Sequence, residues 1–282
     1  MNIRFLQMYI LVATVTSLGA TVQSENFEVS ASSAEVAQSV ADSAEEFRRQ
    51  LALDWLGAEL PVWEPKCLLT VTVRDDSSSG ITSYRFDRGR AGLWEVEVTG
   101  TLERIIDSVL PHELSHTILA SRFSRPLPRW ADEGAAMLAE TESERKRQRL
   151  LTRELVNSKN RTPLRQLLRM KEYPQDRAVM LSLYSVGFSL AEFLVQSGGK
   201  ERYLQFLERA GIVGWDPALD ENYGFIDVES FELDWLKWVN AGSPPLKPSR
   251  KAKWVNSRSV QSPFEQATKL LATRDIVLRI DG

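Results

Sequence analysis

The chain has 282 residues, of which 43% are hydrophobic and 26% charged, and its formal net charge is −3. A chain of this length and composition can bury a substantial core, so it is predicted to be a globular protein of one large or two small domains. The slight acidic excess provides no overall basic field, which argues against nucleic acid as a partner. Cys67 is the only cysteine, so an intrachain disulfide is excluded.

The first residues are typical of an export signal. One arginine precedes an apolar stretch over residues 5–18, and two small residues follow it. This is the layout of a secretory signal peptide, and the apolar stretch is short for a membrane span. Residues 1–24 are therefore predicted to be a signal peptide, cleaved after Ala20 or Ser24, of a periplasmic or secreted protein. The alternative is an uncleaved anchor, which would be the chain's one expected contact with a membrane.

Residues 25–64 are predicted to form an N-terminal helical segment. Ser32 and Glu35 have the spacing of a capping box, and apolar residues follow at helical spacing to about Trp55. An amphipathic helix is therefore expected before the main domain begins.

Three short runs are predicted to be strands, at residues 68–73, 81–86 and 93–98. They are β-branched or alternating, and clusters of Asp, Ser and Gly separate them. They indicate a small antiparallel sheet. The last run alternates apolar and acidic side chains, as an edge strand with one wet face requires. Such an edge could bind an extended peptide by strand addition, and the alternative is ordinary sheet packing.

The next segment is predicted to be a helix that carries both histidines of the chain. Thr101 can cap it, and apolar residues at helical spacing continue to Leu119. Pro111 removes a backbone hydrogen bond and crowds the preceding turn. The helix is therefore expected either to kink or to start afresh just before His112.

The rest of the chain is predicted to be mainly helical. A second helix should follow at residues 131–156, and two further helical patterns, at 179–199 and 200–211, end in glycine. Residues 243–282 are a predicted basic linker and C-terminal tail, with one short helical pattern and one strand-like run. The basic stretch is either a solvated linker or a contact with an anionic surface. The predicted fold class is α+β: a small antiparallel sheet packed on the histidine-bearing helix, followed by a helical subdomain.

The stretch LPHELSHTIL places His112 and His116 four residues apart, with Glu113 between them. Two histidines placed at random in such a chain would have this spacing in roughly one case in a hundred. Residues four apart lie on one face of a helix, so both imidazoles can bind one ion. Glu113 lies about 100° around the helix, where its carboxylate can face a water on that ion. This is the H-E-x-x-H pattern of zinc hydrolases, and Zn²⁺ is the predicted cofactor.

A catalytic zinc usually has three protein ligands and an open position for water. The chain has no third histidine, so the third ligand must be a carboxylate or Cys67. Glu133, near the start of the next helix, is one candidate, and the small residues at 134–136 would let that helix approach the first one. Asp132 is the competing carboxylate, which can instead cap the helix or support a ligand.

The segments VLPHELSHTIL and LPRWADEGAA resemble the gluzincin zinc metallopeptidases, in particular the peptidase MA-like group. The resemblance implies a zincin-like fold with a catalytic domain over residues 65–242. Carried over by position, it makes His112, His116 and Glu133 the zinc ligands and Glu113 the catalytic base.

The resemblance also implies a reaction, the hydrolysis of a peptide bond by a zinc-activated water whose proton Glu113 takes. A peptide or protein is then the expected substrate. Tyr184 lies where related gluzincins often carry a tyrosine that stabilises the oxyanion. The alternative is that Tyr184 is simply a core residue of an apolar helix.

The chain departs from the gluzincin pattern in two places. Some members have an aspartate four residues after the ligand glutamate, where this chain has Met137, so Asp107 and Glu140 are candidate partners for the histidines. The G-x-M-E-N segment of the aminopeptidases is absent, which favours an endopeptidase. The alternatives are a catalytically idle gluzincin scaffold that binds peptides and a metal hydrolase that cuts another bond. The sequence leaves the oligomeric state open.

Overall fold

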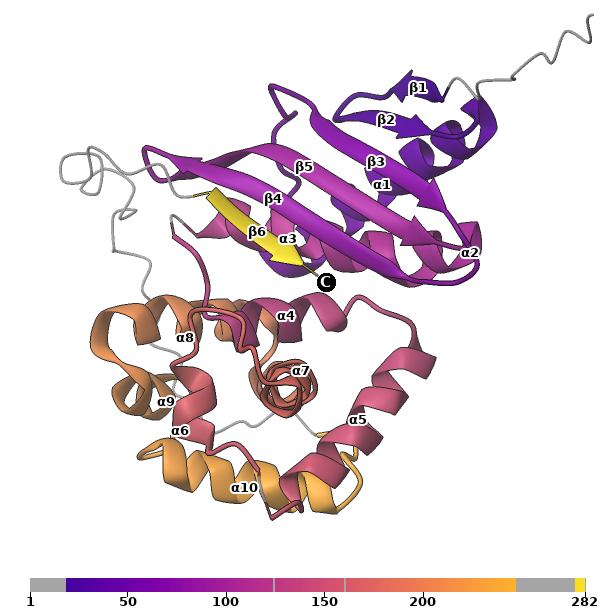
Figure 1. Ribbon diagram of the computed structural model, residues 1–282. Coiled ribbons are helices and arrows are strands. Elements are labelled where there is room, and N and C mark those ends of the chain that lie inside the picture. The colour runs from indigo at the N-terminus through magenta and orange to yellow at the C-terminus, as the bar shows by residue number, and fades with distance from the viewer. Residues whose placement is uncertain (1–18, 124, 160, 247–276, 282) are drawn as a thin grey trace, which may run out of the picture.

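A computed structural model describes residues 19–123, 125–159, 161–246 and 277–281. Within these residues one β-sheet packs against a group of helices, and Figure 1 shows the sheet above the helical part. The predicted α+β class is confirmed. Helix α3 lies against the sheet and α4 heads the helical part, so the segments that carry the histidines and Glu133 lie where the two parts meet.

The sheet has six strands in the order β1-β2-β3-β5-β4-β6. The pairs β2/β3 and β3/β5 are parallel and the other three are antiparallel, so the prediction of an antiparallel sheet is wrong. Helix α1 connects β2 to β3 and returns the chain to the sheet in the same direction, which makes this pair parallel. β5 turns back from β4 and lies between β4 and β3, so it runs parallel to β3. The strands are β1 (Ala20–Gln23), β2 (Phe27–Ala31), β3 (Cys67–Val73), β4 (Ser79–Asp87), β5 (Arg90–Gly100) and β6 (Val277–Asp281).

The strand predicted at residues 93–98 lies inside the sheet, as part of β5, between β3 and β4. Its alternation is real, since Trp94, Val96 and Val98 are buried whereas Glu95 and Glu97 are exposed. The prediction of an edge strand is wrong, because one open face of a sheet gives internal strands the same alternation. β5 therefore has no free edge for a peptide.

Helix α1 (Ala34–Leu56) is the predicted N-terminal helix, and its end near Trp55 is as expected. Its N-cap is Ser33 rather than Ser32, because the Ser33 hydroxyl accepts the hydrogen bond from Val36 N–H. α1 contacts β2 and α3. It therefore covers the sheet and the histidine-bearing helix together.

Two strands that the sequence analysis does not give precede α1. β1 lies within the predicted signal peptide and pairs antiparallel with β2. The apolar stretch at residues 5–18 lies outside the described residues, so the export signal stays a prediction. Cleavage after Ser24 would remove β1 from the sheet, whereas cleavage after Ala20 would remove one residue of it.

The histidine-bearing segment is helical without a break from residue 102 to residue 122. Thr101 caps it as predicted, with its hydroxyl accepting from the backbone N–H of Arg104. The segment consists of α2 (Leu102–Arg104), a π-helical turn η1 (Ile105–Val109) and α3 (Leu110–Arg122).

The π-helical turn lies directly before Pro111. In it the Leu110 N–H donates to the Ile105 carbonyl, five residues back. The wider turn suits a proline, which has no N–H and crowds the carbonyl four residues earlier. Of the two alternatives expected at Pro111, the fresh helix start is therefore excluded, and the proline is accommodated within one continuous helical segment.

The helix predicted at 131–156 is two helices, separated at residues 138–141, where the backbone of Thr141 becomes extended and begins the second one. α7 ends at Gly199 as its glycines predict, whereas α8 continues past Gly211, its predicted end, and ends at Gly214. The helices of this part are α4 (Arg129–Met137), α5 (Glu142–Val156), α6 (Leu164–Leu168), α7 (Arg177–Gly198), α8 (Lys200–Val213), α9 (Trp215–Tyr223) and α10 (Val228–Asn240).

Helix α7 is the centre of the helical part and appears end-on in Figure 1, with the other helices around it. Among the described helices it alone is long and apolar enough for a membrane span, with a mean hydropathy of 1.7 over its most apolar window. Of that window 67% is buried inside the protein. A core helix has the same composition, and α7 is packed as one.

Helices α4 and α7 approach so closely that their backbones touch. A Cβ added at Gly134 would lie 2.3 Å from the Gly187 carbonyl oxygen. The small residues at 134–136 are predicted to let α4 approach α3, but at Gly134 the close neighbour is α7. The glycine is therefore needed for a different helix pair.

The predicted C-terminal tail contributes β6, which matches the strand-like run in the sequence. Residues 247–276, with most of the basic stretch and the short helical pattern, lie outside the described residues. The sheet thus combines strands from the N-terminal segment, the central domain and the C-terminal tail.

Candidate metal centre

His112 and His116 on α3 and Glu133 on α4 come together at one buried point. Each offers one ligand atom, and these atoms lie within 4.8 Å of one another. Glu133 Oε2 is 3.5 Å from His112 Nε2 and 3.9 Å from His116 Nε2. The structure therefore groups the three residues that the sequence analysis names as zinc ligands.

Three side-chain atoms of this cluster have no hydrogen-bond partner among the described residues. They are both ring nitrogens of His116 and Glu133 Oε2, and both side chains are fully buried. A buried polar group without a partner costs about 1–3 kcal/mol. Two imidazole nitrogens and one carboxylate oxygen are also the donor set of many catalytic zinc sites. The residues present therefore fit a zinc ion.

Each histidine has a carboxylate near its other ring nitrogen. His112 Nδ1 hydrogen-bonds to Glu140 Oε1 at 2.8 Å, and His116 Nδ1 lies 3.1 Å from Asp132 Oδ1. Ligating histidines commonly have such partners, which orient the ring and leave the second nitrogen for the metal. Asp132 thus lies behind His116, outside the donor group. Of the two candidate partners for the histidines, it is Glu140, and not Asp107, that contacts one.

The charges of the cluster are strongly coupled. Burial lowers the pKa of His112, but the carboxylates of Glu133 and Glu140 outweigh it and raise that pKa well above its ordinary value. Burial raises the pKa of Glu133, and the neighbouring histidines outweigh it and lower that pKa. Metal binding to this site must therefore release protons from the imidazoles.

Glu113 is held by strand β4. Its Oε2 accepts a hydrogen bond from the Thr82 hydroxyl at 2.6 Å. Its Oε1 lies against Gly80, where an added Cβ would be only 2.3 Å away. The side chain is 1% exposed, and burial raises its pKa. The sheet thus fixes the position of this carboxylate.

Gly80 and Thr82 are two residues of the site that are not predicted from the sequence. Both occupy inward-facing positions of β4, which continue as Tyr84 and Phe86. A glycine and a hydroxyl residue in the place of large apolar ones are a signal that this part of the inner face meets a polar group.

Tyr173 is a third residue of the site that is not predicted from the sequence. Its hydroxyl donates to Glu133 Oε1, and the Arg129 guanidinium lies over its ring, 4.4 Å from the centroid. Burial raises the pKa of Tyr173, so the phenol keeps its proton and acts as a donor. Tyr173 lies in the connection between α6 and α7, where no periodic pattern marks it.

Tyr184 on α7 stacks on Tyr173, with ring centroids 6.4 Å apart and planes 17° apart. Tyr184 also lines the cleft that His112 and Glu113 reach. Burial raises its pKa, which keeps the phenol protonated. This position is compatible with the predicted role as a donor to an oxyanion, which stays a prediction.

An open cleft leads to the cluster, with an empty volume of about 940 Å³ that includes space open to solvent. His112 and Glu113 line it, whereas His116 and Glu133 are buried behind them. The other walls come from the start of β4 and from α5 and α7. Its further lining includes Ser78, Ser79, Gly80, Arg104, Val109, Met137, Glu140, Glu144, Arg147, Leu151, Leu181 and Tyr184.

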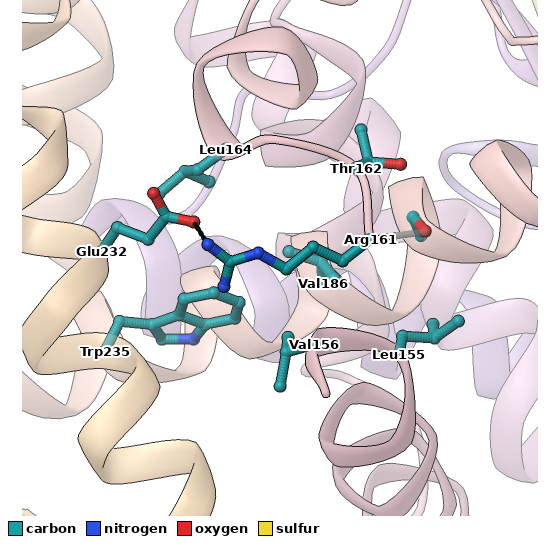
Figure 2. A pocket seen from close by; sticks show the side chains of 9 residues that line it. Leu155, Val156, Arg161, Thr162, Leu164, Val186, Glu232 and Trp235 are labelled. Atoms are coloured by element: carbon teal, nitrogen blue, oxygen red, sulfur yellow. Dashed lines mark ion pairs between the residues drawn. The ribbon is translucent and has the colours of Figure 1, made fainter. Parts of the chain in front are cut away.

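A second, narrow hollow lies elsewhere in the helical part, with an empty volume of about 270 Å³ that includes space open to solvent. Figure 2 shows Arg161 inside it, paired with Glu232 at 3.0 Å and lying beside Trp235. Its charged groups pair with each other, and none of its lining residues belongs to the cluster. This hollow is therefore separate from the cluster of His112, His116 and Glu133, which the larger cleft reaches.

Cys67, the other ligand considered from the sequence, lies on β3 and is not part of the cluster. It is fully buried. Burial raises the pKa of its thiol, so it stays protonated. It is accordingly a core residue.

No protein-family model, curated protein or solved structure matches the chain. The gluzincin resemblance of the two motifs thus has no support from these comparisons. Function is inferred from the geometry of the site.

Proposed function

We propose that this protein is a zinc-dependent endopeptidase of the gluzincin type, exported by its N-terminal segment. His112, His116 and Glu133 would hold the zinc, and Glu113 would be the general base. The observation that carries the proposal is the group of three buried donor atoms within 4.8 Å, two of them without a hydrogen-bond partner among the described residues. An open cleft gives a substrate access to this group.

A bound zinc would supply a Lewis acid that lowers the pKa of a coordinated water to about 7 and polarises a carbonyl. The chain's own contribution begins with Glu113, whose carboxylate lines the cleft and is held by Thr82. Burial raises the pKa of this carboxylate and makes it a stronger base than an exposed glutamate. It can accept a proton from the attacking water and pass it to the leaving amine.

The other residues of the site would position the zinc ligands and stabilise the oxyanion. Asp132 and Glu140 hold the two imidazoles from behind, and Tyr173 holds Glu133. Tyr184 presents a protonated phenol to the cleft, which suits hydrogen bonding to an oxyanion as it forms. We assign an endopeptidase because the chain lacks the G-x-M-E-N segment that binds a free amine in the aminopeptidases.

The first test is the zinc content of the purified protein, measured by mass spectrometry beside Glu133→Gln and Glu113→Gln. We expect about one zinc per chain in the wild type and in Glu113→Gln, because a base is not a ligand. Glu133→Gln should lose zinc, and both variants should lose hydrolysis of an unfolded protein. Circular dichroism must show that both variants are folded.

Absence of zinc even after reconstitution would refute the proposal. Zinc at full occupancy without hydrolysis would favour the second candidate, a catalytically idle scaffold that binds peptides. Cleavage of small esters, but not of unfolded protein, would indicate a different metal hydrolase. The intact Glu113, held at the cleft by Thr82 and Gly80, favours catalysis over the idle scaffold.

A further inference from the structure

The C-terminal strand β6 lies along the edge of β4, on the side of the sheet nearest the helical part (Figure 1). The two strands are antiparallel, and their register extends from Arg85 opposite Val277 to Ile81 opposite Asp281. β6 therefore runs toward the start of β4.

The start of β4 is the part of the sheet that touches the candidate active site. Ser79 and Gly80 line the cleft, Gly80 lies against the Glu113 carboxylate, and Thr82 hydrogen-bonds to it. Asp281 pairs with Ile81, which lies between Gly80 and Thr82. In the part of the chain that the structure describes, β6 is the strand on this edge of β4.

We propose that β6 is an internal inhibitory strand, which occupies the edge of β4 that an extended substrate peptide needs. This inference rests on the proposed peptidase function. A strand edge offers a row of N–H and C=O groups to any extended segment, and one segment can pair with it at a time. Catalysis then requires that residues 277–281 leave β4.

The connection between β6 and the helical part sets the strength of this competition. Residues 247–276 tether β6 to the domain whose edge it covers. Because β6 belongs to the same chain as β4, their pairing is intramolecular and needs no second molecule. A dilute free peptide would therefore bind the full chain poorly.

The test is a reversible cross-link in the full chain, Ser83→Cys combined with Arg279→Cys. These residues are direct partners in the register, and Ser83 lies on the face of β4 opposite to Thr82. Directly opposite residues in antiparallel strands have Cα atoms about 4.5–5.5 Å apart, which suits a disulfide. The natural Cys67 is buried on β3, and each single variant is a control.

We expect the oxidised double variant to form the disulfide and keep its zinc. It should cleave an unfolded protein at least ~10-fold more slowly than the same protein after reduction, because the cross-link prevents β6 from leaving the edge of β4. A labelled peptide that copies residues 275–281, added at millimolar concentration to the zinc-free protein, should bind only the reduced form. This binding measurement does not depend on catalysis.

Proline substitutions should have the opposite effect. Adjacent residues of an antiparallel strand point their N–H groups alternately toward and away from the partner strand. Of Arg279→Pro and Ile280→Pro, the variant that removes an N–H directed at β4 should raise the cleavage rate several-fold, and the other serves as its control.

Failure to form the disulfide would overturn the pairing of β6 with β4. Equal cleavage by oxidised and reduced protein would overturn the inhibition and leave the peptidase intact. If neither form cleaves although both hold zinc, the proposed peptidase function fails. The peptide-binding measurement then tests by itself whether β6 covers the edge of β4. Binding of the labelled peptide to the reduced form alone would support the proposal that β6 covers this edge. Equal binding to the oxidised and reduced forms would overturn that proposal.

Discussion

The Glu113 carboxylate lies directly against the backbone of Gly80, so closely that a Cβ at Gly80 would be 2.3 Å from Oε1. A real Cβ cannot occupy this distance, and either the strand or the carboxylate must move. The proposed general base is therefore positioned by the absence of a side chain on a neighbouring strand.

Gly80→Ala should destabilise the protein by about 1–3 kcal/mol, the usual cost of overpacking. It should also reduce hydrolysis at least ~10-fold, since small misplacements of catalytic groups have large effects. The zinc content should not change. Chemical denaturation and initial rates measure the two effects.

Gly92→Ala on β5 is the matched control, because a Cβ there would meet no atom within 4 Å. In a Glu113→Ala background the clash is removed, so Gly80→Ala should cost less stability than in the wild type. Identical costs in the two backgrounds would show that the contact with Glu113 is not what makes Gly80 necessary.

Thr82→Val should lower the hydrolysis rate about 10-fold and leave zinc binding unchanged. The substitution keeps the shape of the side chain but removes the donor to Glu113 Oε2, now at 2.6 Å. Thr82→Ser keeps the hydroxyl and should retain most of the activity. Steady-state rates on one unfolded substrate test the pair, and equal losses in both variants would contradict this role of the hydroxyl.

Asp132→Asn and Glu140→Gln should each weaken zinc binding about 10–100-fold, the usual range for partners of metal-binding histidines. The effect should be larger for Asp132, because its histidine partner, His116, is fully buried whereas Glu140 lies nearer the surface. Competition with a chromophoric chelator measures the affinities. Unchanged affinity in both variants would argue against a metal at these histidines.

Tyr173→Phe should affect mainly zinc binding, and Tyr184→Phe should affect mainly the hydrolysis rate. Tyr173 donates to Glu133, so its loss should lower zinc affinity about 10-fold or more. Tyr184 lines the cleft, so its loss should lower the hydrolysis rate about 10²-fold with little effect on zinc affinity, as for a removed oxyanion donor. Calorimetric zinc titration and rate measurements on both variants test this. A reversed pattern would exchange the two roles.

Much of the candidate site follows from the sequence because its geometry is local. Four residues make about one helical turn, so the spacing of His112 and His116 is enough to place both on one helix face. Gly199, which ends α7, likewise acts on its own helix. The grouping of Glu133 with the histidines follows the sequence prediction, although only the packing of α4 against α3 brings it within reach.

The sequence by itself determined α1, the strands β3, β4 and β5 and the two-histidine helix, because local periodicity depends on residues a few positions apart. The tertiary structure alone decided the parallel pairing of β3 with β5, the place of β5 inside the sheet and the cover of β4 by β6. It also decided that Gly80, Thr82 and Tyr173 surround the two glutamates. These contacts join residues tens of positions apart, and their distances depend on how whole strands and helices pack, which no local spacing encodes.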